Sequence, residues 1–299
     1  MNIVYVILAH KLPEQLVRLV NKLNSDSSYF IIHVDKKTDR ETYGSMAGPL
    51  HTYKNVSFLY RYRHYYGDFN HLLATLDAFK KVHELGIPYD YIILLTGQDY
   101  PLKSNKCIQR TLQESDGNSF LEYFPLPNEH WKDENGGLDR VIYWNFNLCG
   151  REFAIREKNR FIPSFLVPLS SAFAEILPIQ RKLPGDLKPF GGSAYWCLSR
   201  DCIEYMNNFV QQNKALVNFF KYVKIPEETF FQTVLLNSPL KNRIVNDNLR
   251  YIVWSTTRHP AVLQKEGLKE FINTDRLFAR KFDVTIDSDV LDMIDHVTS

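Results

Sequence analysis

The chain has 299 residues, of which 44% are hydrophobic and 23% charged, the composition of a globular protein with a sizeable core. Its formal net charge of +2 lacks the basic excess typical of nucleic-acid-binding proteins, so we expect no nucleic-acid partner.

Apolar runs bounded by polar residues predict strands buried on both faces, and apolar residues at helical spacing predict helices between them. In chain order, strands are expected at 3–10, 29–35, 56–60 and 89–102, and helices at 12–24 and 68–85. Asp68 is the expected N-cap of the second helix. This alternation predicts an α/β fold in which helices flank a mostly parallel central sheet, and such sheets bind ligands at the carboxyl ends of their strands.

The pattern changes from about residue 118. Strands are expected at 119–126 and 140–147, and a glycine-rich turn, a short strand and a helix within 190–213. Residues 151–190 receive no assignment. Because there is no internal repeat and no Pro/Ser-rich linker, we expect a single domain over residues 1–299.

The four cysteines show no spacing typical of a zinc site, and we expect free thiols in a reducing compartment. The apolar run near the N-terminus is too short to span a bilayer and has no basic leader before it. We therefore expect a cytoplasmic protein without a transmembrane segment.

Polar residues follow two of the predicted strands. His33, Val34 and Asp35 end the second strand, where a nucleotide base or ribose can dock; alternatively, Asp35 only caps the following turn. Gln98 and Asp99 follow the fourth strand, where an acidic residue can bind a metal or sugar hydroxyls, or else serve the turn. Because the two strand ends converge on one edge of the sheet, the pattern favours binding.

Two further segments combine special backbone with useful side chains. Gly191 and Gly192 predict a closely approached backbone before Tyr195, which can stack on a sugar, while Trp196 is expected in the core. Near the C-terminus, adjacent Arg280 and Lys281 can clamp a diphosphate, or form a solvated basic surface.

Glu227 and Glu228 follow Pro226 at the start of an apolar helical pattern. Acidic residues in a first turn complement the helix dipole, and this is the reading that the stretch alone favours. A carboxylate held at a helix start beside a cleft can instead act as a general base.

Seven segments, taken in order, resemble the core-2/I-branching β-1,6-N-acetylglucosaminyltransferase family, which includes the peptide O-xylosyltransferases. They are HVDKK, YYGDFNHLLATLDAF, LLTGQDYPLKSN, GGSAYWCLSR, PEETFFQTVLLNS, LRYIVW followed by HP, and FARKFD. The resemblance implies a glycosyltransferase-A fold, with a Rossmann-like nucleotide-binding half at 1–117 and an acceptor half with a C-terminal diphosphate-binding portion at 118–299. It also implies an inverting transfer from a UDP-sugar to an acceptor hydroxyl.

The resemblance assigns the catalytic base to Glu228 and leaves Glu227 as a helix-start residue. It puts Lys281 on the donor's diphosphate, with Arg258 as the first choice of companion arginine and Arg250 as the second. Basic side chains replace a metal in this family, so we expect neither a metal ion nor another cofactor. The other donor-binding candidates are His33, Val34, Asp35, Gln98 and Asp99.

The chain lacks the anchor, stem and full cysteine set of the animal members, so it looks like a bacterial member. We expect it to act in the cytoplasm on a surface-polysaccharide or lipid-linked glycan acceptor, with peripheral membrane contact left open, and to use N-acetylglucosamine or xylose as the donor sugar. The alternatives are a non-catalytic sugar-nucleotide or glycan-binding protein of the same fold, and a nucleotidyltransferase that releases pyrophosphate.

Overall fold

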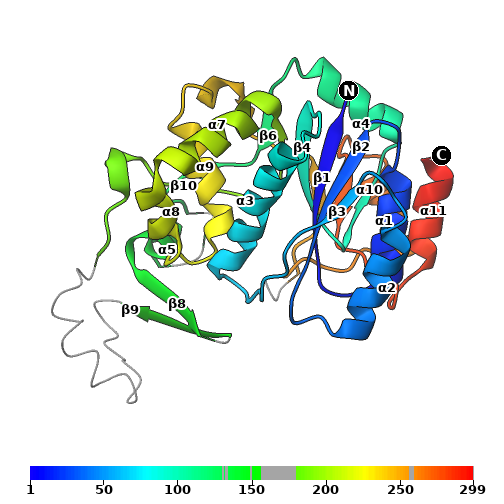
Figure 1. Cartoon of the computed structure of the whole chain (residues 1–299), viewed down its shortest axis with the longest axis horizontal. Coiled ribbons are helices and arrows are strands. Elements are labelled where there is room, and N and C mark those ends of the chain that lie inside the picture. Colours follow the sequence, from blue (N-terminus) through cyan, green and yellow to red (C-terminus); the bar gives the residue numbers. More distant parts are fainter. Residues whose placement is uncertain (130, 132–133, 149, 156–179, 256–258, 299) are drawn as a thin grey trace.

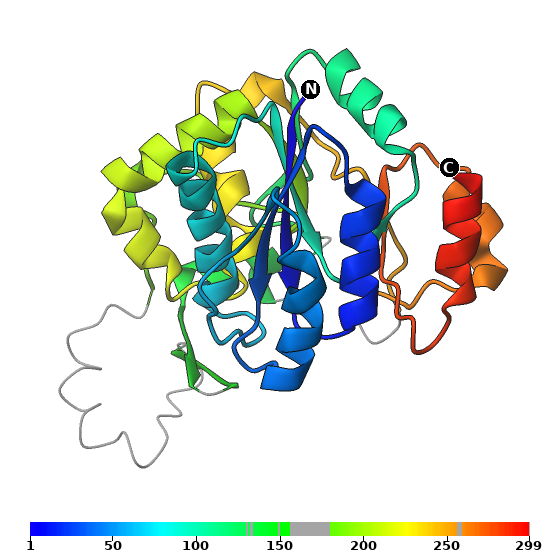
Figure 2. The same cartoon turned by 45° about the vertical axis from the view of Figure 1, so that its right-hand side comes forward.

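The computed structural model describes residues 1–129, 131, 134–148, 150–155, 180–255 and 259–298. In these residues a seven-stranded sheet lies between two layers of helices (Figures 1 and 2), as predicted. Only β11 runs antiparallel to its neighbours in this sheet, so the sheet is mostly parallel. In spatial order the strands are β12 (Ile244–Val245), β6 (Ser119–Leu121), β11 (Trp196–Ser199), β4 (Tyr91–Thr96), β1 (Ile3–Ala9), β2 (Ser28–Val34) and β3 (Val56–Phe58).

Alternate residues of the central strands belong to separate hydrophobic clusters on the two faces of the sheet. On β1, Ile3, Tyr5 and Ile7 join one cluster, while Val4 and Val6 join the other. Because helices cover both faces of the sheet, the sequences of its central strands are continuous apolar runs. The first cluster includes residues of α1 (Pro13–Leu23), α2 (Arg40–Leu50), α4 (Asn105–Glu114), α10 (Leu268–Ile272) and α11 (Asp289–Val297); the second includes residues of α3 (Phe69–Glu84), α7 (Arg200–Gln212), α8 (Lys214–Phe220) and α9 (Phe230–Leu236).

Helix α3 begins where the sequence predicts it. The side chain of Asp68 accepts hydrogen bonds from the backbone N–H of Asn70, at 3.0 Å, and from that of Tyr65, at 2.9 Å. The cap therefore also ties the preceding loop to the start of the helix.

The C-terminal part of the chain returns to the edge of the central sheet at which β1, β2 and β4 end. A second sheet places β14 (Phe278–Arg280) between β13 (Arg250–Ile252) and β5 (Asp99–Pro101), with Arg280 opposite Asp99. Beyond β14, α11 stands beside α1 (Figure 2), where Arg18 and Asp295 form an ion pair of 2.6 Å. Because β5 follows β4 almost directly, this pairing brings the C-terminal basic run to the carboxyl end of β4.

A hairpin of β8 (Trp144–Leu148) and β9 (Arg151–Ile155) lies at the lower left of Figure 1, next to α5 (Asp139–Ile142). The strand expected at 140–147 is thus wrong in its first half, which is helical. The buried guanidinium of Arg181 holds the hairpin to the end of α8: it donates a hydrogen bond of 2.9 Å to the carbonyl of Tyr222 and lies 4.5 Å from the centre of the Trp144 ring. Burial lowers the pKa of Arg181 to about 10.

The other elements are short. They are β7 (Phe124–Pro125) paired with β10 (Phe190–Gly191), and the 3-10 turns η1 (Glu134–Gly137), η2 (Pro184–Asp186), η3 (Pro226–Glu228), η4 (Lys241–Arg243) and η5 (Lys265–Gly267). No helix in the described part of the chain combines the length and apolar character needed to cross a lipid bilayer.

Candidate active site

The carboxyl ends of β1, β2 and β4 lie side by side. Ala9 is the register partner of Val34, and Leu8 is the partner of both His33 and Thr96. The residues that follow these strands therefore share one edge, as the sequence predicts.

The end of β2 folds the following loop across this edge. The Asp35 carboxylate accepts hydrogen bonds from the backbone N–H of Lys37, at 2.8 Å, and of His64, at 3.3 Å. Nε2 of His33 accepts from the N–H of Tyr62 at 3.0 Å; since burial lowers the pKa of His33 to about 4, the imidazole is neutral and suited to accept. Val34 is buried in the hydrophobic core, so its side chain packs there and only its backbone can contact a ligand.

The end of β4 binds the C-terminal run instead of projecting free side chains. The Gln98 amide donates to the carbonyl of Phe282 at 3.1 Å. Asp99 is fully buried; its carboxylate accepts from the N–H of Thr96 at 2.7 Å and lies 3.4 Å from Nη1 of Arg280. Gln98 and Asp99 thus position the segment that carries Arg280.

Arg280 and Lys281 are the cations of this segment. The Arg280 guanidinium lies over the ring of Tyr195, 4.2 Å from its centre, and the side chain is 11% exposed. Its Nε and Nη1 have no hydrogen-bond partner among the described residues, although buried donors are normally paired. Lys281 is half-buried, and no hydrogen bond or ion pair of its ammonium occurs within that part of the chain. These are suitable donors for an anion.

The two arginines expected to accompany Lys281 have other positions. Arg258 lies outside the described residues. Arg250 is only 4% exposed, and its guanidinium donates to the carbonyl of Leu94, at 2.7 Å, and to Sγ of Cys197, at 3.1 Å. Arg250 therefore ties β13 to the central sheet from the interior, and this placement argues against phosphate binding.

Glu228 lies half-buried in η3, with a side chain 27% exposed. Its Oε2 is 2.7 Å from Nη1 of Arg140 on α5, and Arg140 in turn lies over the ring of Trp131, 3.8 Å from its centre. The sequence reasoning missed Arg140, because its segment was assigned to a strand. A fixed, partly exposed carboxylate of this kind can accept a proton from a bound alcohol.

The backbone around Glu228 is held in an uncommon conformation. Ile225 has φ 51° and ψ 60°, a left-handed conformation that is unfavourable for a β-branched residue. Its N–H donates to the carbonyl of Gly67 at 3.2 Å, and its own carbonyl accepts from the N–H of Glu228 at 3.1 Å. Strained residues held by their surroundings cluster at functional sites.

The segment 192–195 contacts the Glu228 turn through Gly192 and Arg280 through Tyr195. The N–H of Gly192 donates to the carbonyl of Glu228 at 2.9 Å, and a Cβ on Gly192 would lie 1.9 Å from the carbonyl oxygen of Glu122. The predicted close approach is therefore confirmed, as is the burial of Trp196. Tyr195, under Arg280, is three residues beyond Gly192, a reach of about 10 Å at most.

Glu227 lies in the first turn of η3, as expected of a helix-start residue, but its side chain points into the interior. Its side chain is 11% exposed, and its Oε1 lies 3.4 Å from Nδ1 of His71 on α3. Nothing in the sequence pattern identifies His71 as its partner.

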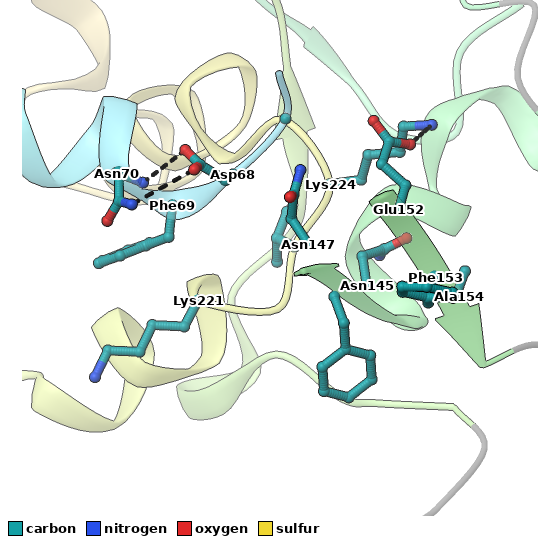
Figure 3. A pocket seen from close by; sticks show the side chains of 13 residues that line it. Asp68, Phe69, Asn70, Asn145, Asn147, Glu152, Phe153, Ala154, Lys221 and Lys224 are labelled. Carbon is teal, nitrogen blue, oxygen red and sulfur yellow. Dashed lines mark hydrogen bonds and ion pairs between the residues drawn. The ribbon is translucent and has the colours of Figure 1, made fainter. Parts of the chain in front are cut away.

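A pocket of about 560 Å³ opens beside this turn (Figure 3). Its walls come from the start of α3, the β8–β9 hairpin and the segment after α8, where Lys224 and Glu152 form an ion pair of 3.0 Å. Tyr66, next to Gly67 of the pocket wall, is largely exposed; partial burial raises the pKa of its phenol, and the charge of Glu228 adds to the increase. The pocket is lined by Gly67, Asp68, Phe69, Asn70, Asn145, Phe146, Asn147, Glu152, Phe153, Ala154, Lys221, Val223 and Lys224.

Known proteins are similar in sequence to this chain over nearly its whole length. A family model described as Core-2/I-Branching enzyme matches residues 3–274. Xylosyltransferase 2 of Mus musculus and of Homo sapiens are both 26% identical over 98% of the chain, and xylosyltransferase 1 of Homo sapiens is 24% identical over 99%. The chain spans about a third of the length of these relatives, from 30% to 33%. Because the family model covers most of its residues, this chain belongs to the Core-2/I-branching enzyme family.

Proposed function

We propose that the protein is an inverting glycosyltransferase that moves a sugar from a UDP-sugar to a hydroxyl of a glycan acceptor without a metal ion. The observation that carries the proposal is the short segment 192–195, which contacts the Glu228 turn at one end and Arg280 at the other. We infer that the carboxylate and the two cations act on one bound donor. The xylosyltransferase relatives favour xylose as the donor sugar, with N-acetylglucosamine as the other candidate.

In this proposal the carboxylate and the cations act on opposite faces of the sugar. Glu228 removes the proton from the acceptor hydroxyl as the oxygen attacks the anomeric carbon, and UDP leaves from the other face. Arg280 and Lys281 stabilise the negative charge that develops on the diphosphate. The companion of Lys281 is then Arg280: its Nη1 forms an ion pair of 3.4 Å with Asp99, and its buried Nε has no hydrogen-bond partner in the described chain. The edge formed by His33, Val34 and Asp35 is proposed to receive the nucleoside, with Gln98 and Asp99 supporting the cations.

The reaction is tested by measuring UDP release from a panel of UDP-sugars, with and without oligosaccharide acceptors. We expect UDP, and not pyrophosphate, as the product, and UDP-xylose or UDP-N-acetylglucosamine as the best donor. Because cationic side chains supply the charge stabilisation, the rate should be unchanged in EDTA. Release of pyrophosphate would indicate a nucleotidyltransferase, absence of turnover a binding protein, and strict dependence on manganese a metal-dependent mechanism.

We propose further that the acceptor glycan occupies the pocket whose wall includes Lys224, just before the turn that carries Glu228. Its volume is in the usual range for small-molecule sites, and Glu152 offers a carboxylate of the kind that binds sugar hydroxyls. Glu152→Ala should raise the acceptor KM about tenfold, the loss expected for a hydrogen bond to a charged group, and should change the donor KM much less. Glu204→Ala, on the exposed face of α7, is the matched control. Equal changes in both KM values would contradict this location.

A further inference from the structure

The turn that carries Glu228 also holds a second carboxyl group, in the interior. Oε2 of Glu227 is buried and has no hydrogen-bond partner among the described residues. Its Oε1 faces Nδ1 of His71 at 3.4 Å, and within that part of the chain this nitrogen is likewise buried without a hydrogen bond. A carboxyl oxygen and an imidazole nitrogen that face each other in the interior are most stable when a proton lies between them, because an unpaired buried charge is costly.

The protonation of both groups agrees with this arrangement. Burial raises the pKa of Glu227 from its ordinary value of 4.5 to about 8, and the neighbouring charge of Glu228 adds to the increase. Burial lowers the pKa of His71 well below its ordinary value of 6.5. At neutral pH the carboxyl group therefore keeps its proton and the imidazole is uncharged.

Among the described residues, no arginine or lysine forms an ion pair with Glu227. Arg140 is paired with Glu228, and Arg280 with Asp99. On α3 and the loop before it, the ring of His64 lies 5.0 Å from that of His71, and His64 faces Asp68 at 3.9 Å. The titratable and charged groups that act on the pair are Glu228, Asp68, Arg140, His64, His33 and Arg280.

We propose that Glu227 is a positioning residue for Glu228: its protonated carboxyl group and the neutral His71 form an uncharged contact that fixes η3 against α3. This inference rests on the proposed role of Glu228 as the base. If Glu227 were ionised, it would add a second negative charge beside Glu228, and its buried charge would favour displacement of the turn towards solvent. The neutral contact leaves Glu228 as the ionised carboxylate of the turn.

The protonation can be tested on the whole chain without any ligand, by urea unfolding between pH 6.5 and about 8. In this window the folded protein keeps a proton on Glu227 that the unfolded chain has released, so Glu227 should contribute an increase of the unfolding equilibrium constant with pH of up to about tenfold per pH unit. Glu227→Gln cannot titrate and should reduce the slope by this amount. Glu84→Gln, on the exposed end of α3, should leave the slope unchanged. The histidines with lowered pKa are about half protonated in the unfolded chain at pH 6.5, so near that pH they add a slope of opposite sign that fades towards pH 8. The comparison of Glu227→Gln with the wild type removes this contribution, because both proteins contain the same histidines.

The positioning role has a separate readout in the kinetics of transfer. Glu227→Leu should lower kcat at least tenfold with a much smaller change in the donor KM, and Glu227→Gln should restore a large part of kcat. The wild-type kcat should decline above about pH 8, as Glu227 ionises, and this decline should be absent in Glu227→Gln.

Two outcomes would overturn the inference. An unchanged unfolding slope in Glu227→Gln would show that the carboxyl group is not protonated, and an unchanged kcat profile in a variant with the altered slope would show that it does not position the base. Because the unfolding experiment needs no substrate, it still decides the protonation if the chain proves not to be a transferase. If Glu227→Leu does not fold, the comparison of Glu227→Gln with the wild type decides both points.

Discussion

Glu228→Gln is expected to reduce transfer by a factor of about 10² to 10⁴, the usual contribution of a general base. The amide keeps the size of the side chain and can still accept a hydrogen bond from Arg140, but it cannot take the proton of the acceptor hydroxyl. The affinity for UDP should change little, because the proposed phosphate ligands are on β14 and just after it, not on η3. Measurements of kcat and of UDP binding by calorimetry on the same preparation separate the two effects.

The matched control is Glu204→Gln, which changes an exposed carboxylate on α7 in the same way and should leave kcat near the wild-type value. A Glu228→Gln variant that turns over at close to the wild-type rate would exclude Glu228 as the base. A large loss of UDP affinity in this variant would instead indicate a binding role.

Lys281→Ala is expected to weaken UDP binding roughly 10- to 150-fold, because a hydrogen bond to a charged group contributes about 1.5–3 kcal/mol. Within the described chain its ammonium forms no hydrogen bond or ion pair, so a phosphate would be its main partner. Arg280→Met should weaken UDP binding to a similar extent and also lower the stability of the protein, since it leaves the buried carboxylate of Asp99 without its cation.

Lys269→Ala, on the exposed face of α10, removes the same charge elsewhere and should not change the affinity. The wild-type affinity should fall as salt is added, and it should fall less steeply in Lys281→Ala. An unchanged dissociation constant for Lys281→Ala would rule out the proposed diphosphate clamp.

The first half of the fold could be predicted well, because its elements are specified by local patterns. The apolar runs at β1, β2 and β4 and the cap at Asp68 indicate strands and a helix start without reference to the rest of the chain. Helices α2 and α4 were not assigned, although Asp39 and Ser104 cap them by accepting from the N–H of Thr42 and Cys107. Residues 119–126 form two short strands, β6 and β7, instead of one.

The candidate site could be predicted only in part. The convergence of the strand ends follows from parallel pairing, and the close approach at Gly192 follows from its glycine. The partners of the charged residues could not be predicted, since Arg140 is 88 residues from Glu228 in the sequence. Arg250 shows the same difficulty. An arginine at this position of the sequence suits phosphate binding, but its guanidinium lies inside the protein.

The sequence by itself determined the α/β alternation, because hydrophobic periodicity and turn residues act over a few neighbouring positions, and its order of seven short segments indicated the family. Only the tertiary structure decided which charges meet. The antiparallel pairing of β14 with β5 puts Arg280 on Asp99, and the packing of η3 on α3 turns Glu227 towards His71. Such contacts depend on long-range packing, in which burial and the available partners fix the protonation and the role of each side chain.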